Sequence, residues 1–137
     1  MKKFLKSLLA VMLIAIMALS LTSCGVPSDP AKAKENLTKN EFTVDETAGA
    51  LAVGVYVTAA YGLSASKNIG KVILASKDSD SVLIVYSEDA ELLEKLHKDL
   101  EALYAEVVKG DEEVDLEKGK SGDCVWVGTS AGVKAAC

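Results

Sequence analysis

Few residues of this 137-residue chain have side chains that could carry out covalent or acid–base chemistry. There are three cysteines (Cys24, Cys124 and Cys137) and one histidine (His97), and the chain has no arginine and no glutamine. One histidine cannot supply a multi-histidine metal site, and a catalytic histidine needs a nucleophile that the fold brings to it. One enzymatic hypothesis therefore follows, a small thiol-dependent enzyme that uses Cys124 and His97. The competing interpretation places His97 at the border of the apolar stripe of a helix.

Two short motifs suggest ligand sites but lack required residues. Gly119-Lys120-Ser121 has the ending of a phosphate-binding P-loop, but Val114 stands where that motif needs its first glycine. An acidic run nearby consists of Asp111, Glu112, Glu113, Asp115 and Glu117. It lacks the turn glycine and the bidentate glutamate of a calcium-binding EF-hand. We therefore predict no metal and no cofactor, and we interpret the acidic run as a solvated strand face.

The first 23 residues have the pattern of an export signal. Lysines at positions 2, 3 and 6 precede an apolar segment, residues 8–21, which is too short for an ordinary transmembrane helix. The following Leu21-Thr22-Ser23-Cys24-Gly25 resembles the lipobox of bacterial lipoproteins. That resemblance implies a diacylglycerol on the sulfur of Cys24 and cleavage just before it, so that residues 1–23 are a removed signal peptide. The alternatives are a plain secretory signal and an uncleaved signal anchor.

The resemblance also implies where the protein resides. Two acyl chains anchor a protein stably, whereas one chain binds marginally. We expect a protein on the extracytoplasmic face of a bacterial cell membrane, with the membrane as its partner through Cys24. Residues 24–28 would form a tether to a single domain, residues 29–137. At about 3.3 Å per residue, this tether keeps the domain within roughly 15–20 Å of the membrane.

Lipidation of Cys24 leaves two thiols in a compartment that permits disulfides. A bridge between Cys124 and Cys137 requires the closing helix to fold back along its preceding strand. In the chain-entropy model such a bridge stabilises the fold by about 3 kcal/mol. The alternatives are that Cys124 is a core residue and that Cys137 frays with the end of the chain.

The rest of the chain alternates helix and strand signals. Asp29 before Pro30 is typical of an N-cap followed by the first helical residue, and four acidic residues among residues 88–94 favour a helix start. We predict a helix at 30–39, a short strand at 42–44, a hairpin of strands 72–75 and 82–86, a helix at 88–108 capped by Ser87, a second hairpin at 114–127 that turns at 119–122, and a closing helix at 130–136 capped by Thr129.

Residues 47–66 contain no charged side chain. Leu51, Val55 and Ala59 have helical spacing, but Leu51, Val53, Val55 and Val57 also have strand spacing. The segment is long enough to span a bilayer, although its glycines, tyrosines and hydroxyl residues dilute the large aliphatic ones. We favour a helix whose apolar character all round suits a buried core element.

Paired strands separated by helices predict an α+β domain of two layers, an antiparallel sheet with helices on one face. Three features resemble a group of small lipoproteins from Firmicutes: the start Asp29–Leu37, the acidic helix after a hairpin, and the ending from Val125-Trp126-Val127 through Lys134-Ala135-Ala136. The resemblance implies the same fold and the same anchor, and it implies no activity.

The charge of the chain excludes one class of partner. Three of the 15 basic residues lie in the first 23, so residues 24–137 carry 12 lysines against 20 acids, a net charge of −8. Nucleic-acid binding needs a basic surface, so we expect no nucleic-acid partner.

The expected anchor, the short tether and the lack of a catalytic set of residues favour a non-enzymatic binding or accessory module for a protein or small-molecule ligand at the cell surface. The alternatives are the thiol-dependent enzyme and a structural protein of the cell envelope.

Overall fold

The computed structural model describes residues 26–108 and 116–137. These residues form one antiparallel sheet with strand order β1-β2-β3-β5-β4, and helices pack on it. The strands are β1 (Thr43–Asp45), β2 (Ile69–Lys77), β3 (Asp80–Ser87), β4 (Leu116–Ser121) and β5 (Cys124–Thr129). The helices are α2 (Pro30–Lys39), α3 (Glu46–Tyr61), α4 (Leu63–Ser66), α5 (Ala90–Lys98), α6 (Leu100–Val108) and α7 (Ser130–Ala136). The predicted α+β class is confirmed.

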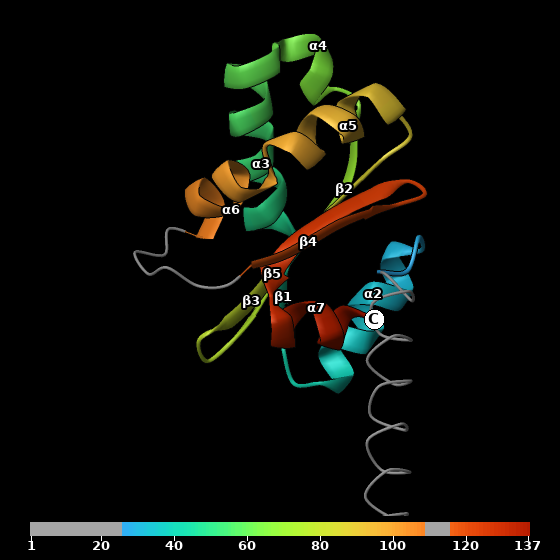
Figure 1. Ribbon diagram of the computed structural model, residues 1–137, viewed down its shortest axis with the longest axis vertical. Helices are drawn as coiled ribbons and strands as arrows, with labels where there is room; N and C mark the ends of the chain where they lie inside the picture. The colour runs from blue at the N-terminus through green and yellow to red at the C-terminus, as the bar shows by residue number, and fades with distance from the viewer. Residues whose placement is uncertain (1–25, 109–115) are drawn as a thin grey trace, which may run out of the picture.

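The helices cover both faces of the sheet, not one face as expected. Alternate residues of β3 point to opposite sides, so Ile84 packs in a core cluster with α2 and α7, whereas Val85 packs in a second cluster with α3, α5 and α6. Figure 1 shows α2 and α7 on one side of the sheet and α3, α5 and α6 on the other. A strand that is apolar at consecutive positions exposes hydrophobic surface on both faces, and each face needs a cover.

Helix starts follow the sequence signals closely. As predicted, Asp29 caps α2, since its carboxylate accepts a hydrogen bond of 3.0 Å from the Ala31 amide, and the helix ends at Lys39 with Asn40 as its C-cap. Thr129 caps α7 through the Gly132 amide, also as predicted. The N-cap of α5 is Asp89 and not the predicted Ser87, whose hydroxyl instead accepts from the Asp89 amide. Asp89 prevails because its carboxylate accepts from two helix amides.

The predicted helix at 88–108 is broken at Asp99 into α5 and α6. The Tyr61 hydroxyl of α3 donates to the Asp99 carboxylate and lies 3.3 Å from the Lys95 carbonyl oxygen. The Lys95 ammonium also lies over the Tyr61 ring, 5.8 Å from its centre. Aspartate disfavours helix interiors because its side chain bonds locally, and this contact with α3 holds Asp99 at the break.

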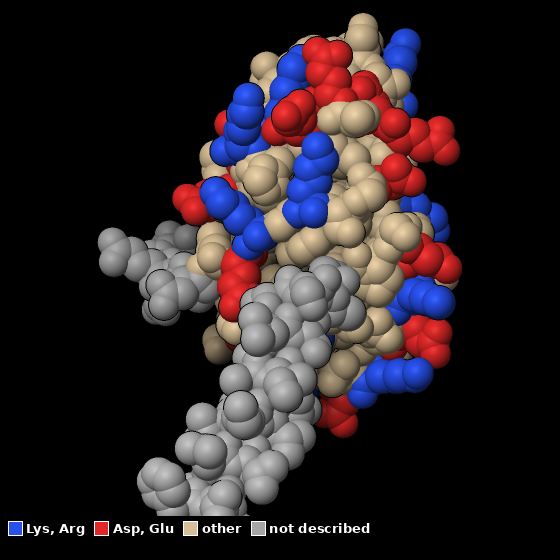
Figure 2. All heavy atoms as spheres, turned by 45° about the vertical axis from the view of Figure 1, so that its right-hand side comes forward, with Lys and Arg blue, Asp and Glu red and all other residues tan. Residues whose placement is uncertain are grey.

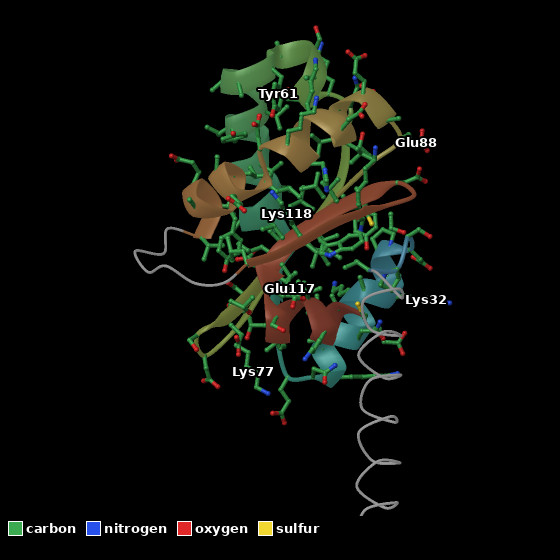
Figure 3. The ribbon with its side chains drawn as sticks, viewed as in Figure 1. Lys32, Tyr61, Lys77, Glu88, Glu117 and Lys118 are labelled. Atoms are coloured by element: carbon green, nitrogen blue, oxygen red, sulfur yellow. The ribbon has the colours of Figure 1, made fainter. Side chains whose placement is uncertain are left out.

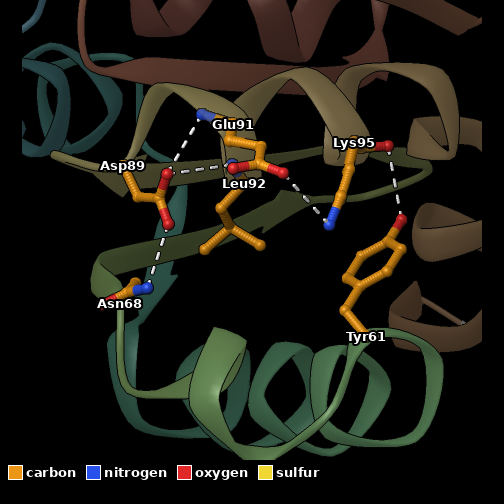
Figure 4. A network of polar contacts seen from close by, with 6 residues as sticks. All are labelled: Tyr61, Asn68, Asp89, Glu91, Leu92 and Lys95. Atoms are coloured by element: carbon orange, nitrogen blue, oxygen red, sulfur yellow. Dashed lines mark hydrogen bonds and ion pairs between the residues drawn. The ribbon is translucent and has the colours of Figure 1, made fainter.

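The same region is fixed at its other end by Asp89 (Figure 4). Its carboxylate accepts from the Glu91 amide at 3.0 Å and from the Asn68 side chain at 2.9 Å. Asn68 precedes β2, so this bond ties the start of α5 to the sheet.

Burial and the nearby Asp99 raise the pKa of Tyr61 above its ordinary value, so its hydroxyl remains a hydrogen-bond donor to Asp99 into the alkaline range.

The second hairpin turns later than predicted, at Gly122 and Asp123. Gly119 is a strand residue that faces Trp126 across the β4–β5 pair. A Cβ atom at Gly119 would collide with the indole ring of Trp126. The glycine that suggests a turn is therefore needed for close packing. The first hairpin turns at Asp78 and Ser79, inside the predicted segment.

Candidate functional site

The N-terminal residues of the described chain are part of the core. Val26 is 1% exposed and lies in the cluster that contains Tyr86, Cys124 and Trp126. The Tyr86 hydroxyl donates a hydrogen bond of 2.7 Å to the Pro27 carbonyl. We call these residues, Val26, Pro27, Tyr86 and Cys124, the N-terminal junction. Val26 and Pro27, which were expected to belong to a tether, are therefore held by the fold.

Cys124 is fully buried within this junction. Its thiol donates to the Ser121 carbonyl at 3.2 Å and lies 4.0 Å from the Val26 carbonyl. Burial, followed by the charge of Asp123, raises the pKa of Cys124 to about 11. Because the thiolate is the nucleophilic form of cysteine, a thiol with this pKa is a weak nucleophile at neutral pH.

The two residues of the thiol-enzyme hypothesis lie on opposite faces of the sheet. His97 is on α5, whose buried leucines belong to the cluster with α3 and α6. Cys124 belongs to the cluster with α2 and α7. The sheet therefore separates the imidazole from the thiol, and the fold does not assemble the pair.

No disulfide joins Cys124 to Cys137 in the described part of the chain, because Cys124 carries a free thiol. Cys137 follows α7, which packs on β3 and beside α2. The Asn36 side chain donates to the Ala136 carbonyl at 3.1 Å, and that of Asn40 lies 3.4 Å from the Ala135 carbonyl. α7 also contacts β5, so the closing helix folds back over its preceding strand as the prediction required, without a bridge to Cys124.

Other residues singled out in the sequence fall mainly outside the structure. Cys24 with the lipobox, and residues 111–115 of the acidic run, lie outside the described residues. Glu117 is exposed on β4, and Figure 3 shows it on the opposite side of the strand from Lys118. Lys118 pairs with Glu101 of α6 at 3.6 Å. Among residues 26–108 and 116–137, no group of three or more possible metal ligands comes together.

Helix α3, which carries no charge after Glu46, buries only one of its faces. Val53 and Val57 are fully buried, and Gly49 lies so close to β2 that a Cβ atom there would sit 3.0 Å from the Leu74 Cβ. Leu51 and Val55 are 71% and 67% exposed. The expectation of a wholly buried helix is wrong, and its exposed side is an uncharged surface. We call it the α3 face: Thr47, Ala50, Leu51, Gly54, Val55, Thr58 and Ala59.

Three open grooves connect the α3 face to Ser28, near the start of the described residues. One, of about 630 Å³, runs along the α3 face itself. The second, of about 510 Å³, shares Ala50 and Leu51 with it and extends to Lys71. The third, of about 190 Å³, shares Gly70 and Lys71 with the second and reaches Ser28. The N-terminal junction and the α3 face are therefore neighbouring parts of one surface.

Lys71 lies where the second and third grooves meet. Its ammonium is 3.9 Å from the Glu46 carboxylate, which is also 3.8 Å from the Lys34 ammonium. Glu88 and Asp123 line the third groove. The surface near the junction is therefore polar and of mixed charge, whereas the α3 face is uncharged. Figure 2 shows lysines and acidic residues intermingled on the face that it presents, with no continuous basic patch there.

Within the residues that the structure describes, no helix is both long enough and apolar enough to cross a membrane. Comparison with known proteins gives no match among protein-family models, curated proteins or solved structures.

The sequence did not single out Val26, Tyr86 or the exposure of the α3 face. A signal was available for Val26, because the valine and the proline that follow Gly25 are poor choices for a flexible tether. Tyr86 had no local signal, because its partner Pro27 is 59 residues away. The α3 face had none either, because α3 is apolar on all sides and its pattern does not say which side is covered.

Proposed function

We propose that this chain is a bacterial lipoprotein, anchored to the extracytoplasmic face of the cell membrane by a diacylglycerol on Cys24. The lipobox and the charge and length of the leader support the anchor. The burial of Val26 adds that the chain is already held by the fold two residues after Cys24, so an anchor there would keep the domain close to the membrane. Cleavage before Cys24 removes the leader and leaves every described core residue in place.

The anchored domain acts as a non-enzymatic binding or accessory module for a protein or small-molecule ligand. The single observation that carries this proposal is the placement of Cys124, whose buried thiol has a raised pKa and lies across the sheet from His97. That placement argues against the thiol-dependent enzyme. The connected grooves around Lys71 offer a surface for a ligand next to the membrane.

The test is fractionation of cells that express the wild-type chain or the Cys24→Ala variant, with intact-mass analysis under non-reducing conditions. We expect the wild type in the membrane fraction, with the mass of residues 24–137 plus a diacylglyceryl group. The variant should be uncleaved and should lack the added mass. A soluble wild type without the lipid would refute the anchor. Sedimentation of the lipidated protein with cell-wall material after detergent extraction would instead favour a structural role in the envelope.

A further inference from the structure

We propose that the α3 face lies against the surface of the same lipid bilayer that holds the Cys24 anchor, as a second membrane contact. This inference rests on the proposed lipoprotein anchor. Its starting observation is that Leu51 and Val55 of α3 are largely exposed, as is Leu63 of α4 at 64%. Leu51 and Val55 line one groove together, and neighbouring apolar side chains left exposed on one surface mark a contact with a partner or a membrane.

The N-terminal junction brings the bilayer close to this surface. Val26 is fixed in the core, and two residues span at most about 7 Å in an extended chain. Cys24 therefore cannot move far from Val26. The acyl chains start at its sulfur, so the membrane surface lies within a few residues' reach of the groove that contains Ser28.

The grooves lead from that point to the α3 face without a break. Ser28 and Lys71 line the third groove, and Lys71 and Leu51 line the second. Leu51 and Val55 line the groove along the α3 face. A bilayer that meets the domain at Ser28 is therefore adjacent to α3.

The chemistry of the α3 face suits the interfacial region of a bilayer. No charged residue occurs from Thr47 to Ser66, so contact with lipid desolvates no charge there. Lys67 follows α4 at one end of the segment, and Lys71, paired with Glu46, borders the second groove. Lysine side chains at the edge of an apolar surface can keep their ammonium groups among lipid headgroups.

The small size of the apolar surface also favours the bilayer over a second copy of this chain. A stable protein interface buries about 800 Å² on each partner around a central apolar cluster. Three large exposed side chains on the described surface offer little toward such an interface. A membrane contact needs no minimum area, because the lipid anchor already supplies the binding and the face has only to orient the domain.

The experiment uses the lipidated full chain, purified from membranes and reconstituted into vesicles made with or without brominated phospholipid. Brominated acyl chains quench tryptophan by short-range contact. One variant carries Val55→Trp and a second carries Leu51→Trp, two exposed positions where a larger side chain disturbs no core contact. The matched control is Ser79→Trp, at the exposed tip of the β2–β3 hairpin, a residue that lines none of the three grooves. The emission of Trp126, present in every variant, is subtracted with the wild type.

We expect the emission added by Val55→Trp and by Leu51→Trp to be lost in brominated vesicles, and the emission added by Ser79→Trp to persist. Persistence of all three emissions in a membrane-bound, lipidated protein would overturn the α3 contact and leave the anchor intact. A blue shift at position 55 that depends on protein concentration, without quenching, would assign the face to a second copy and also overturn the proposal. If the wild type carries no lipid and stays soluble, the anchor fails and this inference fails with it.

Discussion

The Tyr86 hydroxyl and the Pro27 carbonyl are joined by a hydrogen bond of 2.7 Å, although 59 residues separate them in the chain. Tyr86 belongs to the central strand β3, and Pro27 precedes α2. This bond and the burial of Val26 make the first described residues part of the folded domain.

Tyr86→Phe should weaken the docking of the N-terminal segment. The substitution removes one hydrogen bond and keeps the ring, so the free energy of unfolding should fall by about 1 kcal/mol. Hydrogen exchange should become faster at the amides of Ser28 and Asp29. Tyr104→Phe is the control, because it removes the bond between Tyr104 and Ser81 on the other side of the sheet. Equal acceleration at Ser28 in both variants would mean that the Tyr86 bond does not hold the segment.

Val26→Asp should release the segment from the core, since a carboxylate is too costly to bury there. The loss of stability is then limited to what the valine contributes by burial, about 2 kcal/mol. Val55→Asp is the matched control, because Val55 is 67% exposed. It should change stability by no more than about 0.5 kcal/mol. Urea unfolding of both purified chains compares them, and a similar loss in both would contradict the assigned burial.

Two glycines should respond to alanine in opposite directions. Gly119→Ala places a methyl group against the Trp126 ring, and such overpacking should destabilise the fold by about 1–3 kcal/mol. Gly54→Ala meets no atom within 4 Å and lies in a helix, so it should stabilise by up to about 1 kcal/mol. Thermal unfolding gives both signs. Stabilisation by Gly119→Ala would show that the ring has room to move.

Cys124 should resist alkylation in the folded protein and react fully in urea. Its raised pKa keeps it a thiol at pH 7.5, and the junction covers it. Peptide mapping after treatment with iodoacetamide identifies the modified cysteine. Rapid alkylation of folded Cys124 would return the thiol-dependent enzyme to consideration.

The same pKa predicts a loss of stability at high pH. Between the ordinary value of 9.0 and about 11, the unfolded chain loses a thiol proton that the folded chain keeps. The free energy of unfolding should therefore fall across that range, and this thiol should have no effect below it. The difference between the wild type and Cys124→Ala isolates the thiol from the lysines and tyrosines. A difference that is constant from pH 8 to 11 would contradict the raised pKa.

Local signals in the sequence were sufficient for most of the secondary structure. Asp29 with Pro30 and Thr129 with Gly132 mark helix starts through contacts within a few residues, so both predictions are confirmed. The break at Asp99 was missed although aspartate disfavours helix interiors, and the contact that holds it comes from Tyr61, 38 residues away, where no local signal points. Gly119 misled for the same reason, since its partner is the Trp126 ring across the hairpin.

The candidate site was harder to predict than the fold. Val53 and Val55 are the same residue type two positions apart, and only the packing of α3 on β2 decides which one is buried. The covering of both faces by helices was suggested by the apolar run in β3. The prediction of one covered face failed because α2 and α7, 90 residues apart in sequence, join in one layer.

The docking of Val26 also orders events in time. Its pocket is completed by Cys124, 98 residues further along the chain, on a strand that is among the last to be made. In the proposed export, Val26 crosses the membrane before β5, and its binding place does not exist until β5 has followed. On the proposed anchor, the enzymes that lipidate Cys24 and cut before it therefore meet an extended, accessible segment. Once β5 has paired with β3, the segment is held in place and the period of easy access for these enzymes ends.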